Sequence, residues 1–324
     1  MHKKAAGKRA RGILRVRKAR HVPEFRQVRI RRIRPIKLKG DPSLTRTVEQ
    51  ITSVKVQGAK QIATHSLRFL RGFCKRNGFG LKFEVAARVL EDARPTAVVL
   101  HNCIEIVKKK RTLGSIDALL KRMDSMTGDI ARNGSRLLGD GYTIMTHCHS
   151  GEALCIIKRA WKEGKRIAVI ATETEPLEQG VRTVKELAAM KIPVTLITDS
   201  AVGFFMPEVD CVVVGADAIR SEPRFGFVNK TGTMNLALEA RERRKPMYVV
   251  GDTLKLDRRK KLYIEERPAA EVYRKLLNAG ELKGVKIRNP AFEFVPAKLV
   301  TKFVTERGVI SPAGMKRMLG KARK

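Results

Sequence analysis

Two histidines, a cysteine and a serine follow one another in the segment MTHCHSGEALCIIKRAW, residues 145–161. His147, Cys148, His149 and Ser150 are residue types that bind metals, act as bases or nucleophiles, or hold a phosphate group. A zinc site is disfavoured, because consecutive side chains diverge in an extended segment and the sequence has no second ligand group at zinc-finger spacing. We therefore expect no metal at this position.

Cys148 follows a β-branched segment and precedes a helical one. The free N–H groups and the dipole of a helix start favour a thiolate, so this position predicts a lowered pKa and a role as base or nucleophile. A free cysteine is also common as a small buried core residue. The position alone leaves both interpretations open.

Short β-branched segments alternate with helical ones from residue 141 to residue 324. The expected strands are YTIMTH, RIAVIATE, PVTLITD, CVVVGAD and PMYVVGD. This alternation predicts an α/β fold with a Rossmann-like, doubly wound parallel sheet. Ligands of such sheets bind at the carboxyl ends of the strands. The residues that follow the expected strands here are 147–151, 173–176, 199–201, Asp217 and Asp252. The sequence has neither GxGxxG nor a Walker A lysine, and we expect no cofactor.

Residues 44–140 carry apolar residues at helical spacing, with stop signals at Asn77-Gly78 and Arg94-Pro95. They predict a helical domain that precedes the sheet. Residues 1–43 read as a basic, extended arm that ends in the hinge GDPS, residues 40–43.

Charge is the most unusual property of the composition. The 324 residues include 68 Lys and Arg against 32 Asp and Glu, which gives a formal net charge of +36. Residues 1–40 hold 16 of the bases and one acid, and the rest of the chain is still basic by 21 charges. Nucleic acid is the usual partner of so basic a chain. The cations expected on RNA phosphates are Arg9, Arg11, Arg15, Arg17, Arg29, Arg31, Arg32, Arg34 and Lys37.

Five scattered cysteines without a CxxC pair indicate reduced thiols, and hence a cytoplasmic protein. The sequence has no apolar run of about 18 residues, so no membrane span is expected.

Asp217 ends the buried-strand pattern VVVGAD, and burial lets such a carboxyl keep its proton and act as a general acid. Asp217 and Cys148 would then form an acid and base pair that moves a proton between adjacent carbons, which is isomerase chemistry. The turn-forming role common for Asp after a strand is the alternative. Candidate phosphate-binding residues are Arg94, Asn229, Lys230 and Lys255. Each is weak evidence alone, and together they indicate a phosphate site only if the fold brings them to one crevice.

The motifs MTHCHS, TETEP…QG, TDSA, VVVGADAI, NKTGT and NPAFEFVP…TERGVISP occur in this order. Over about residues 45–312 the chain resembles ribose-1,5-bisphosphate isomerase and its relatives, the regulatory subunits of translation initiation factor 2B and methylthioribose-1-phosphate isomerase. The resemblance implies a helical domain, a Rossmann-like domain and dimer-based assembly. It also implies Cys148 as base and Asp217 as acid in converting ribose 1,5-bisphosphate to ribulose 1,5-bisphosphate. The substrate-contacting positions that it implies are Arg94, Ser150, Asn229, Lys230 and Lys255.

Two motifs depart from the family pattern. VQGAK stands where the family has RGAG, so Gln57 replaces a phosphate-binding arginine and Lys60 replaces a glycine. Lys60 can supply the charge of the lost arginine but not its bidentate fork. TETEP stands where the family has TETRP, so Glu175 reverses a charge beside the anion-binding loops.

The basic arm and the altered phosphate positions favour an RNA-binding, ribosome-associated protein in which the isomerase fold has lost or weakened its catalysis. The alternatives are an active ribose-1,5-bisphosphate isomerase and a regulator of initiation factor 2. The expected partners are ribosomal RNA, a second copy of the chain and, if the crevice is still used, a sugar phosphate or nucleotide.

Overall fold

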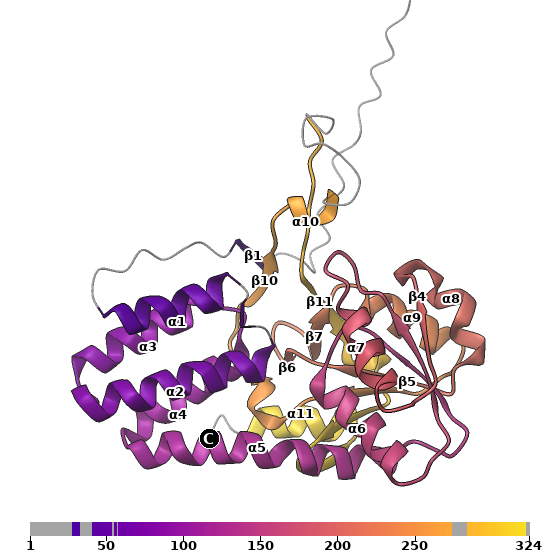
Figure 1. The fold of residues 1–324 in the computed structure, drawn as a ribbon, viewed down its shortest axis with the longest axis horizontal. Coiled ribbons are helices and arrows are strands. Elements are labelled where there is room, and N and C mark those ends of the chain that lie inside the picture. Colours follow the sequence, from indigo (N-terminus) through magenta and orange to yellow (C-terminus); the bar gives the residue numbers. More distant parts are fainter. Residues whose placement is uncertain (1–27, 33–40, 54, 57, 274–283, 322–324) are drawn as a thin grey trace, which may run out of the picture.

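The computed structural model describes residues 28–32, 41–53, 55–56, 58–273 and 284–321. The short strand β1 comes first, five helices follow, and the rest of the chain to the end of α11 consists of strands with helices between many of them (Figure 1). The helices are α1 (Pro42–Thr52), α2 (Ala59–Asn77), α3 (Leu81–Ala93), α4 (Val98–Lys110) and α5 (Leu113–Ser135).

Local sequence signals set the ends of these helices. The Asp41 side chain accepts hydrogen bonds from the backbone N–H groups of Ser43 and Leu44, and Pro42 occupies the first turn of α1. The expected hinge at residues 40–43 is therefore partly helical. At the end of α2, Gly78 takes a φ of 69°, in agreement with the predicted stop at Asn77-Gly78.

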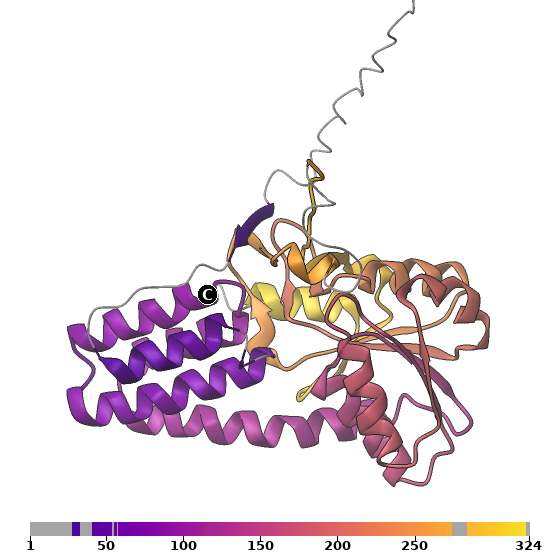
Figure 2. The ribbon, with the colours of Figure 1, turned by 45° about the horizontal axis from the view of Figure 1, so that its top comes forward.

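The five helices bury one shared core, which includes Leu67, Phe83, Leu100 and Met123. Leu254, from the second half of the chain, packs into the same core. The helix α5 continues beyond its neighbours and packs along α6 (Gly151–Lys162), which joins the helical layer to the sheet (Figure 2). The expected boundary between residues 140 and 141 falls between α5 and β2 and stays a prediction.

A seven-stranded sheet forms the second half of the fold, in the order β13-β12-β8-β5-β2-β3-β4. All neighbours are parallel except β12 and β13. The strands are β2 (Thr143–Thr146), β3 (Ala168–Thr172), β4 (Val194–Ile197), β5 (Cys211–Gly215), β8 (Met247–Val250), β12 (Lys302–Thr305) and β13 (Gly308–Ile310). The predicted parallel sheet is confirmed.

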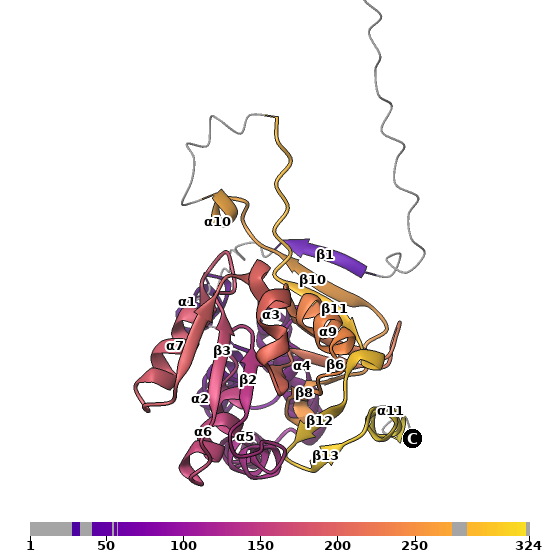
Figure 3. The same ribbon diagram turned by 90° about the vertical axis from the view of Figure 1, so that its right-hand side faces the viewer.

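Helices cover both faces of this sheet. Along β5, Cys211 and Val213 pack into one core, whereas Val212 and Val214 pack into another, because alternate side chains leave a strand on opposite faces. The first core contains residues of α6 and α7 (Gln179–Ala188). The second contains residues of α8 (Val202–Phe205), α9 (Thr233–Glu242) and α11 (Pro312–Lys321). Figure 3 shows α7 beside β3, and α11 next to β12 and β13.

A second, four-stranded sheet was not foreseen from the sequence. Its order is β11-β7-β6-β9, and its strands are β6 (Ala218–Arg220), β7 (Gly226–Lys230), β9 (Leu256–Asp257) and β11 (Phe292–Pro296). These short strands escape a search for β-branched runs, because they carry charged or aromatic residues at positions that the fold buries. The short helix α10 (Ala270–Tyr273) precedes β11.

The segment Val28–Arg32 forms β1, which pairs in parallel with β10 (Leu262–Glu266). The expectation that this segment lies extended on RNA is therefore corrected: it is extended, but its backbone pairs with a strand of its own chain. The remaining residues of the expected RNA-binding arm, which include Arg9, Arg11, Arg15, Arg17, Arg34 and Lys37, lie outside the described residues.

Close packing of α7 on β3 depends on Gly180. A Cβ atom at this position would lie 1.7 Å from the backbone oxygen of Thr172. By contrast, a Cβ at Gly128, inside α5, meets no atom within 4 Å. Gly180→Ala should destabilise the protein by about 1–3 kcal/mol or more, whereas the control Gly128→Ala should stabilise it by about 0.5–1 kcal/mol. Urea unfolding measures both, and equal stabilities of the two variants would contradict the packing described.

Candidate active site

The strands β2 and β5 meet where the strand order of the large sheet reverses. The chain proceeds from β2 to β3 and β4 on one side, and from β5 to β8 and β12 on the other. Ligands of open α/β sheets bind outside the carboxyl ends of the strands at such a switch point. Cys148 follows β2 and Asp217 follows β5, so the topology brings the two predicted catalytic residues to one place.

The loop that carries Cys148 is held by hydrogen bonds on both sides. The Cys148 N–H donates to Thr174 Oγ1 over 2.8 Å, and its carbonyl accepts from Thr183 Oγ1 over 2.9 Å. Cys148 has a φ of 68°, a left-handed conformation that is costly for any residue with a Cβ. The contacts with Thr174 and Thr183 offset this strain and fix the direction of the thiol.

The two neighbouring histidines point to different partners. His147 is buried, and its Nε2 lies 2.9 Å from the carbonyl of Thr231, so Nε2 carries the proton and Nδ1 accepts from Thr172 Oγ1. Burial lowers the pKa of His147 to about 4, which keeps this ring neutral. His149 instead contacts Thr183 and Glu186. The two rings diverge as the sequence predicts, so they do not form a metal site together.

A group of possible metal ligands occurs elsewhere among the described residues, in the helical layer. Glu91, His101 and Glu105 lie close enough to share an ion. Lys108 already donates to Glu91 and to Glu105, over 2.8 and 3.2 Å. Its ammonium occupies the place that a cation would take.

Burial raises the pKa of the Cys148 thiol to about 11, with the nearby Asp217 adding to the shift and Lys230 opposing it. The prediction of a lowered pKa is therefore wrong for this structure, since the loss of water around the sulfur outweighs the helix start. Cys148 still keeps partial exposure to solvent. Its thiol is protonated at neutral pH.

The pKa of Asp217 is shifted in the direction that the sequence predicts, and its role as a general acid stays a prediction. Burial raises the pKa of its carboxyl, and the cations Lys255, Arg94 and Lys230 act in the opposite direction. Its backbone N–H donates to the carbonyl of Val228 over 2.8 Å, which fixes the loop against β7. The Asp217 carboxyl has no hydrogen-bond partner among the described residues.

Lys255 lies in the 3-10 helix η4 (Thr253–Lys255) and is fully enclosed. Burial acts against its charged form, but the carboxylates of Glu152, Asp252 and Asp217 outweigh it and raise the pKa of Lys255. Glu152, in the first turn of α6, forms a hydrogen-bonded ion pair with Lys255. Burial and the nearby Glu152 raise the pKa of Asp252 to about 6. Lys255 is therefore a buried cation held by a carboxylate cluster.

Lys230 and Asn229 end β7 and are both buried. Burial lowers the pKa of Lys230, and its ammonium has no hydrogen-bond partner among the described residues. The Asn229 amide donates to Thr233 Oγ1 over 3.0 Å. A Cβ at Gly215 would lie 2.3 Å from the Ser150 hydroxyl, so this glycine lets the start of α6 approach β5.

Ser150 itself caps α6, because its Oγ accepts from the N–H of Ala153 over 3.3 Å. This contact gives Ser150 a structural role in the structure described.

Arg94, directly after α3, connects the helical layer to β10. Its Nε donates to Glu265 Oε2 over 3.0 Å, and its Nη2 lies 2.9 Å from the same oxygen. Its Nη1 is buried and has no hydrogen-bond partner. An unpaired guanidinium N–H in a buried position costs free energy unless a ligand accepts from it.

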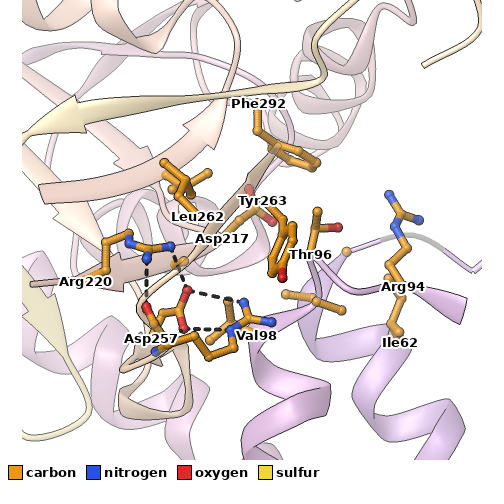
Figure 4. Close-up of a pocket in the computed structure, with 16 residues that line it drawn as sticks. Ile62, Arg94, Thr96, Val98, Asp217, Arg220, Asp257, Leu262, Tyr263 and Phe292 are labelled. Carbon is orange, nitrogen blue, oxygen red and sulfur yellow. Dashed lines mark hydrogen bonds and ion pairs between the residues drawn. The ribbon is translucent and has the colours of Figure 1, made fainter. Parts of the chain in front are cut away.

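Arg94 and Asp217 line one narrow cleft of about 50 Å³ between the two parts of the chain. In Figure 4, Arg94, Thr96 and Ile62 approach this cleft from the helical side, and Tyr263 and Phe292 from the side of the strands. Arg220, which is buried, pairs with Asp257 at the floor over 3.0 Å. Cys148, Lys230 and Lys255 are not among the residues that line this cleft.

The three residues that depart from the family pattern are Gln57, Lys60 and Glu175, and none of them lines this cleft among the described residues. Lys60 donates to Thr127 Oγ1 over 2.9 Å and does not line the cleft, although its neighbours Gly58 and Ala59 do. Gln57 lies outside the described residues. The Glu175 N–H donates to Asp199 Oδ2 over 2.7 Å, in the loop that also holds Cys148 through Thr174.

Comparisons with known proteins agree with this fold and topology. A sequence model described as "Initiation factor 2 subunit family" matches residues 55–312. The chain belongs to this family. Ribose 1,5-bisphosphate isomerase of Archaeoglobus fulgidus is 40% identical over 282 residues, which cover 82% of this chain and 88% of the relative. Methylthioribose-1-phosphate isomerase of Pelotomaculum thermopropionicum is 36% identical, covering 83% of each chain.

Solved structures of the family share the fold. The translation initiation factor eIF-2B of Pyrococcus horikoshii OT3 superposes with a TM-score of 0.74 at 26% identity, covering 84% of this chain and 98% of that one. A chain of the tetrameric eIF2B-beta2-delta2 complex from C. thermophilum gives a TM-score of 0.70 at 19% identity, covering 88% and 97%. The resemblance stated from the sequence motifs is confirmed.

The RNA-binding, ribosome-associated interpretation is wrong. Family members at 36–40% identity over most of the chain are named as sugar-phosphate isomerases. The RNA-binding prediction relied on the net positive charge more than on the ordered motifs. Net charge describes the protein surface and does not identify a ligand of the cleft. Arg29, Arg31 and Arg32 lie on β1, which is paired with β10. Among the described residues, no helix is both long and apolar enough to cross a membrane.

Sequence reasoning missed three residues that hold the site in place. Glu152 binds Lys255, Glu265 binds Arg94, and Thr174 accepts from the Cys148 N–H. Glu152 lies two positions after Ser150, and its acidic side chain in a helix that is otherwise rich in apolar residues was the available signal. Only the structure shows that it is buried.

The raised pKa of Cys148 can be tested by alkylation. The rate of its reaction with iodoacetamide should rise about tenfold per pH unit from pH 7 to pH 10, because only the thiolate reacts. Peptide mass spectrometry separates Cys148 from the other cysteines, and the Cys148→Ser chain confirms the assignment. A rate that reaches its plateau below pH 8 would show that the thiol has a lowered pKa.

Proposed function

We propose that this protein is an aldose–ketose isomerase that converts ribose 1,5-bisphosphate to ribulose 1,5-bisphosphate. One observation carries the proposal: a thiol, a carboxyl and an ammonium lie together near the switch point of the sheet, and neither the carboxyl nor the ammonium has a hydrogen-bond partner among the described residues. These are Cys148, Asp217 and Lys230, and each perturbs the pKa of another member of the group. The two family members at 38–40% identity that carry this name support the choice of substrate.

The proposed reaction moves one hydrogen from C2 to C1 of the sugar. The Cys148 thiolate removes the proton from C2 while the bond between C1 and the ring oxygen breaks, and Asp217 gives its proton to that oxygen. The resulting enol loses its C2 hydroxyl proton to Asp217 as the C2 carbonyl forms, and Cys148 returns its proton to C1. Both residues end in their starting state, as a cofactor-free isomerisation requires.

The protonated thiol of the empty site must first lose its proton. Lys230 opposes the rise in the pKa of this thiol, so its ammonium is the group placed to stabilise the Cys148 thiolate. Lys255 and the free Nη1 of Arg94 are then the cations for the two phosphate groups.

The open volume of about 50 Å³ is smaller than a pentose bisphosphate. We therefore propose that substrate binding separates the helical layer from β10, along the contact between Arg94 and Glu265. The predicted division into a helical domain up to residue 140 and a Rossmann-like domain after it is part of this proposal. The homodimer that the resemblance implies also stays a prediction.

Turnover of ribose 1,5-bisphosphate tests the proposal. The unaltered chain should form ribulose 1,5-bisphosphate, and Cys148→Ser and Asp217→Asn should each lower kcat by about 10²–10⁴-fold, because each removes a proton-transfer group. The matched control is Cys155→Ser, which alters another partly exposed cysteine whose thiol donates to the backbone of α5 and α6. Product formation can be followed by NMR.

Two results would overturn the assignment. One is the absence of turnover by the unaltered, folded chain. The other is a Cys148→Ser chain that keeps its rate within a factor of about ten.

A further inference from the structure

A second, larger cavity lies on the other side of η4. Its volume is about 640 Å³, which falls in the range of small-molecule sites. Its walls come from α4, α5, the segment from η4 to Arg258, and the region of β13 and α11. Residues from four separate parts of the chain therefore line it.

The charged residues of this cavity are almost all cationic. They are Lys109, Arg122, Arg258, Arg307 and Arg317, against the single acid Glu105. Glu105 is itself paired with Lys108 over 3.2 Å. The cavity therefore concentrates positive charge on a concave surface, where it attracts anions more strongly than on a flat one.

Three of these cations are not used by the protein. Lys109, Arg258 and Arg317 form no hydrogen bond or ion pair with any described residue, and all three are exposed. Arg122 is partly used, since it donates to Thr253 Oγ1 over 2.8 Å and lies 3.5 Å from Glu306. Arg307 lies 4.0 Å from the same carboxylate. The two unpaired guanidinium groups come from different elements, and each can bind a phosphate through two N–H groups.

The cavity shares η4 with the candidate active site. Thr253 and Leu254 line the cavity, whereas the next residue, Lys255, pairs with Glu152 towards the cleft. Asn102, also in the cavity wall, donates to the carbonyls of Leu254 and Leu256 over 2.6 and 3.0 Å. An occupant of the cavity would therefore contact the segment that positions Lys255.

We propose that this cavity is a second anion site, which binds a small molecule carrying two or more phosphate groups. The size of the cavity and its concave lining, which comes from several elements, favour a small molecule. The excess of unpaired cations, two of them arginines, favours more than one phosphate group. The proposal concerns a site separate from the cleft and does not require the isomerase activity.

Isothermal titration with inorganic pyrophosphate tests this site. The titrations use the full chain carrying Lys230→Met and Arg94→Met, which remove the two cations of the candidate active site that have an unpartnered N–H group. One pyrophosphate should bind per chain. Adding Arg258→Ala and Arg317→Ala together should weaken this binding at least about tenfold, since two charge-assisted contacts are lost.

The matched control adds Arg241→Ala and Arg243→Ala instead, two exposed arginines at the end of α9 that do not line the cavity. Its affinity should stay within about a factor of two, because the same charge is removed elsewhere. Glu105→Gln, which removes the one acid of the lining, should tighten binding.

Equal weakening by the two arginine pairs would overturn the proposal, since it would show attraction to the overall charge. Absence of binding in the folded chain carrying Lys230→Met and Arg94→Met would also overturn it and would place any phosphate binding at the candidate active site. Neither result depends on turnover, so a chain without isomerase activity can still support the second site.

Discussion

The ion pair between Lys255 and Glu152 is the interaction on which the arrangement of the site depends. Both charges are buried, and removing either partner would leave the other charged in a region without water, which is strongly destabilising. Lys255 belongs to η4, whose Leu254 packs into the core of the helical layer. Glu152 belongs to α6, which covers the sheet. One buried pair therefore links both halves of the chain.

Burial also explains the pKa shifts of the ionisable groups near Cys148. Burial raises the pKa of the Cys148 thiol and of the Asp217 carboxyl and lowers that of Lys230. A site of this kind holds its protons ready for transfer between carbon and oxygen atoms. It suits a reaction that only moves hydrogen within one molecule.

The sequence was sufficient to predict the parallel sheet, whereas the position of the functional site stays a prediction. Buried strands such as CVVVG are recognisable from their β-branched runs, and the strand-end rule then brings Cys148 and Asp217 together. The second sheet could not be predicted, because its short strands carry Arg220, Asn229 and Lys230 at positions that only the tertiary fold buries. The pKa of Cys148 was predicted in the wrong direction for the same reason. A helix start is visible in a sequence, whereas the amount of water around a sulfur atom is not.

The RNA-binding prediction was wrong for a similar reason: a sequence gives the net charge directly but does not give side-chain contacts. Net charge can be counted directly from the sequence, and it is high. The contacts of Arg94 and Lys255 with Glu265 and Glu152 cannot be counted, and they show that two of the cations implied for the substrate are held in defined positions. Positioned cations in a cleft indicate a small anionic ligand more specifically than a total charge does.

The central claim is that C1 and C2 of a sugar bisphosphate lie between Cys148 and Asp217. A crystal structure of the Cys148→Ser chain with ribose 1,5-bisphosphate tests it most directly. The account predicts C2 within van der Waals contact of the Ser side chain at position 148, and the ring oxygen within hydrogen-bond distance of the Asp217 carboxyl. A sugar bound with C1 and C2 away from both residues, or an empty cleft at a saturating concentration, would contradict the account.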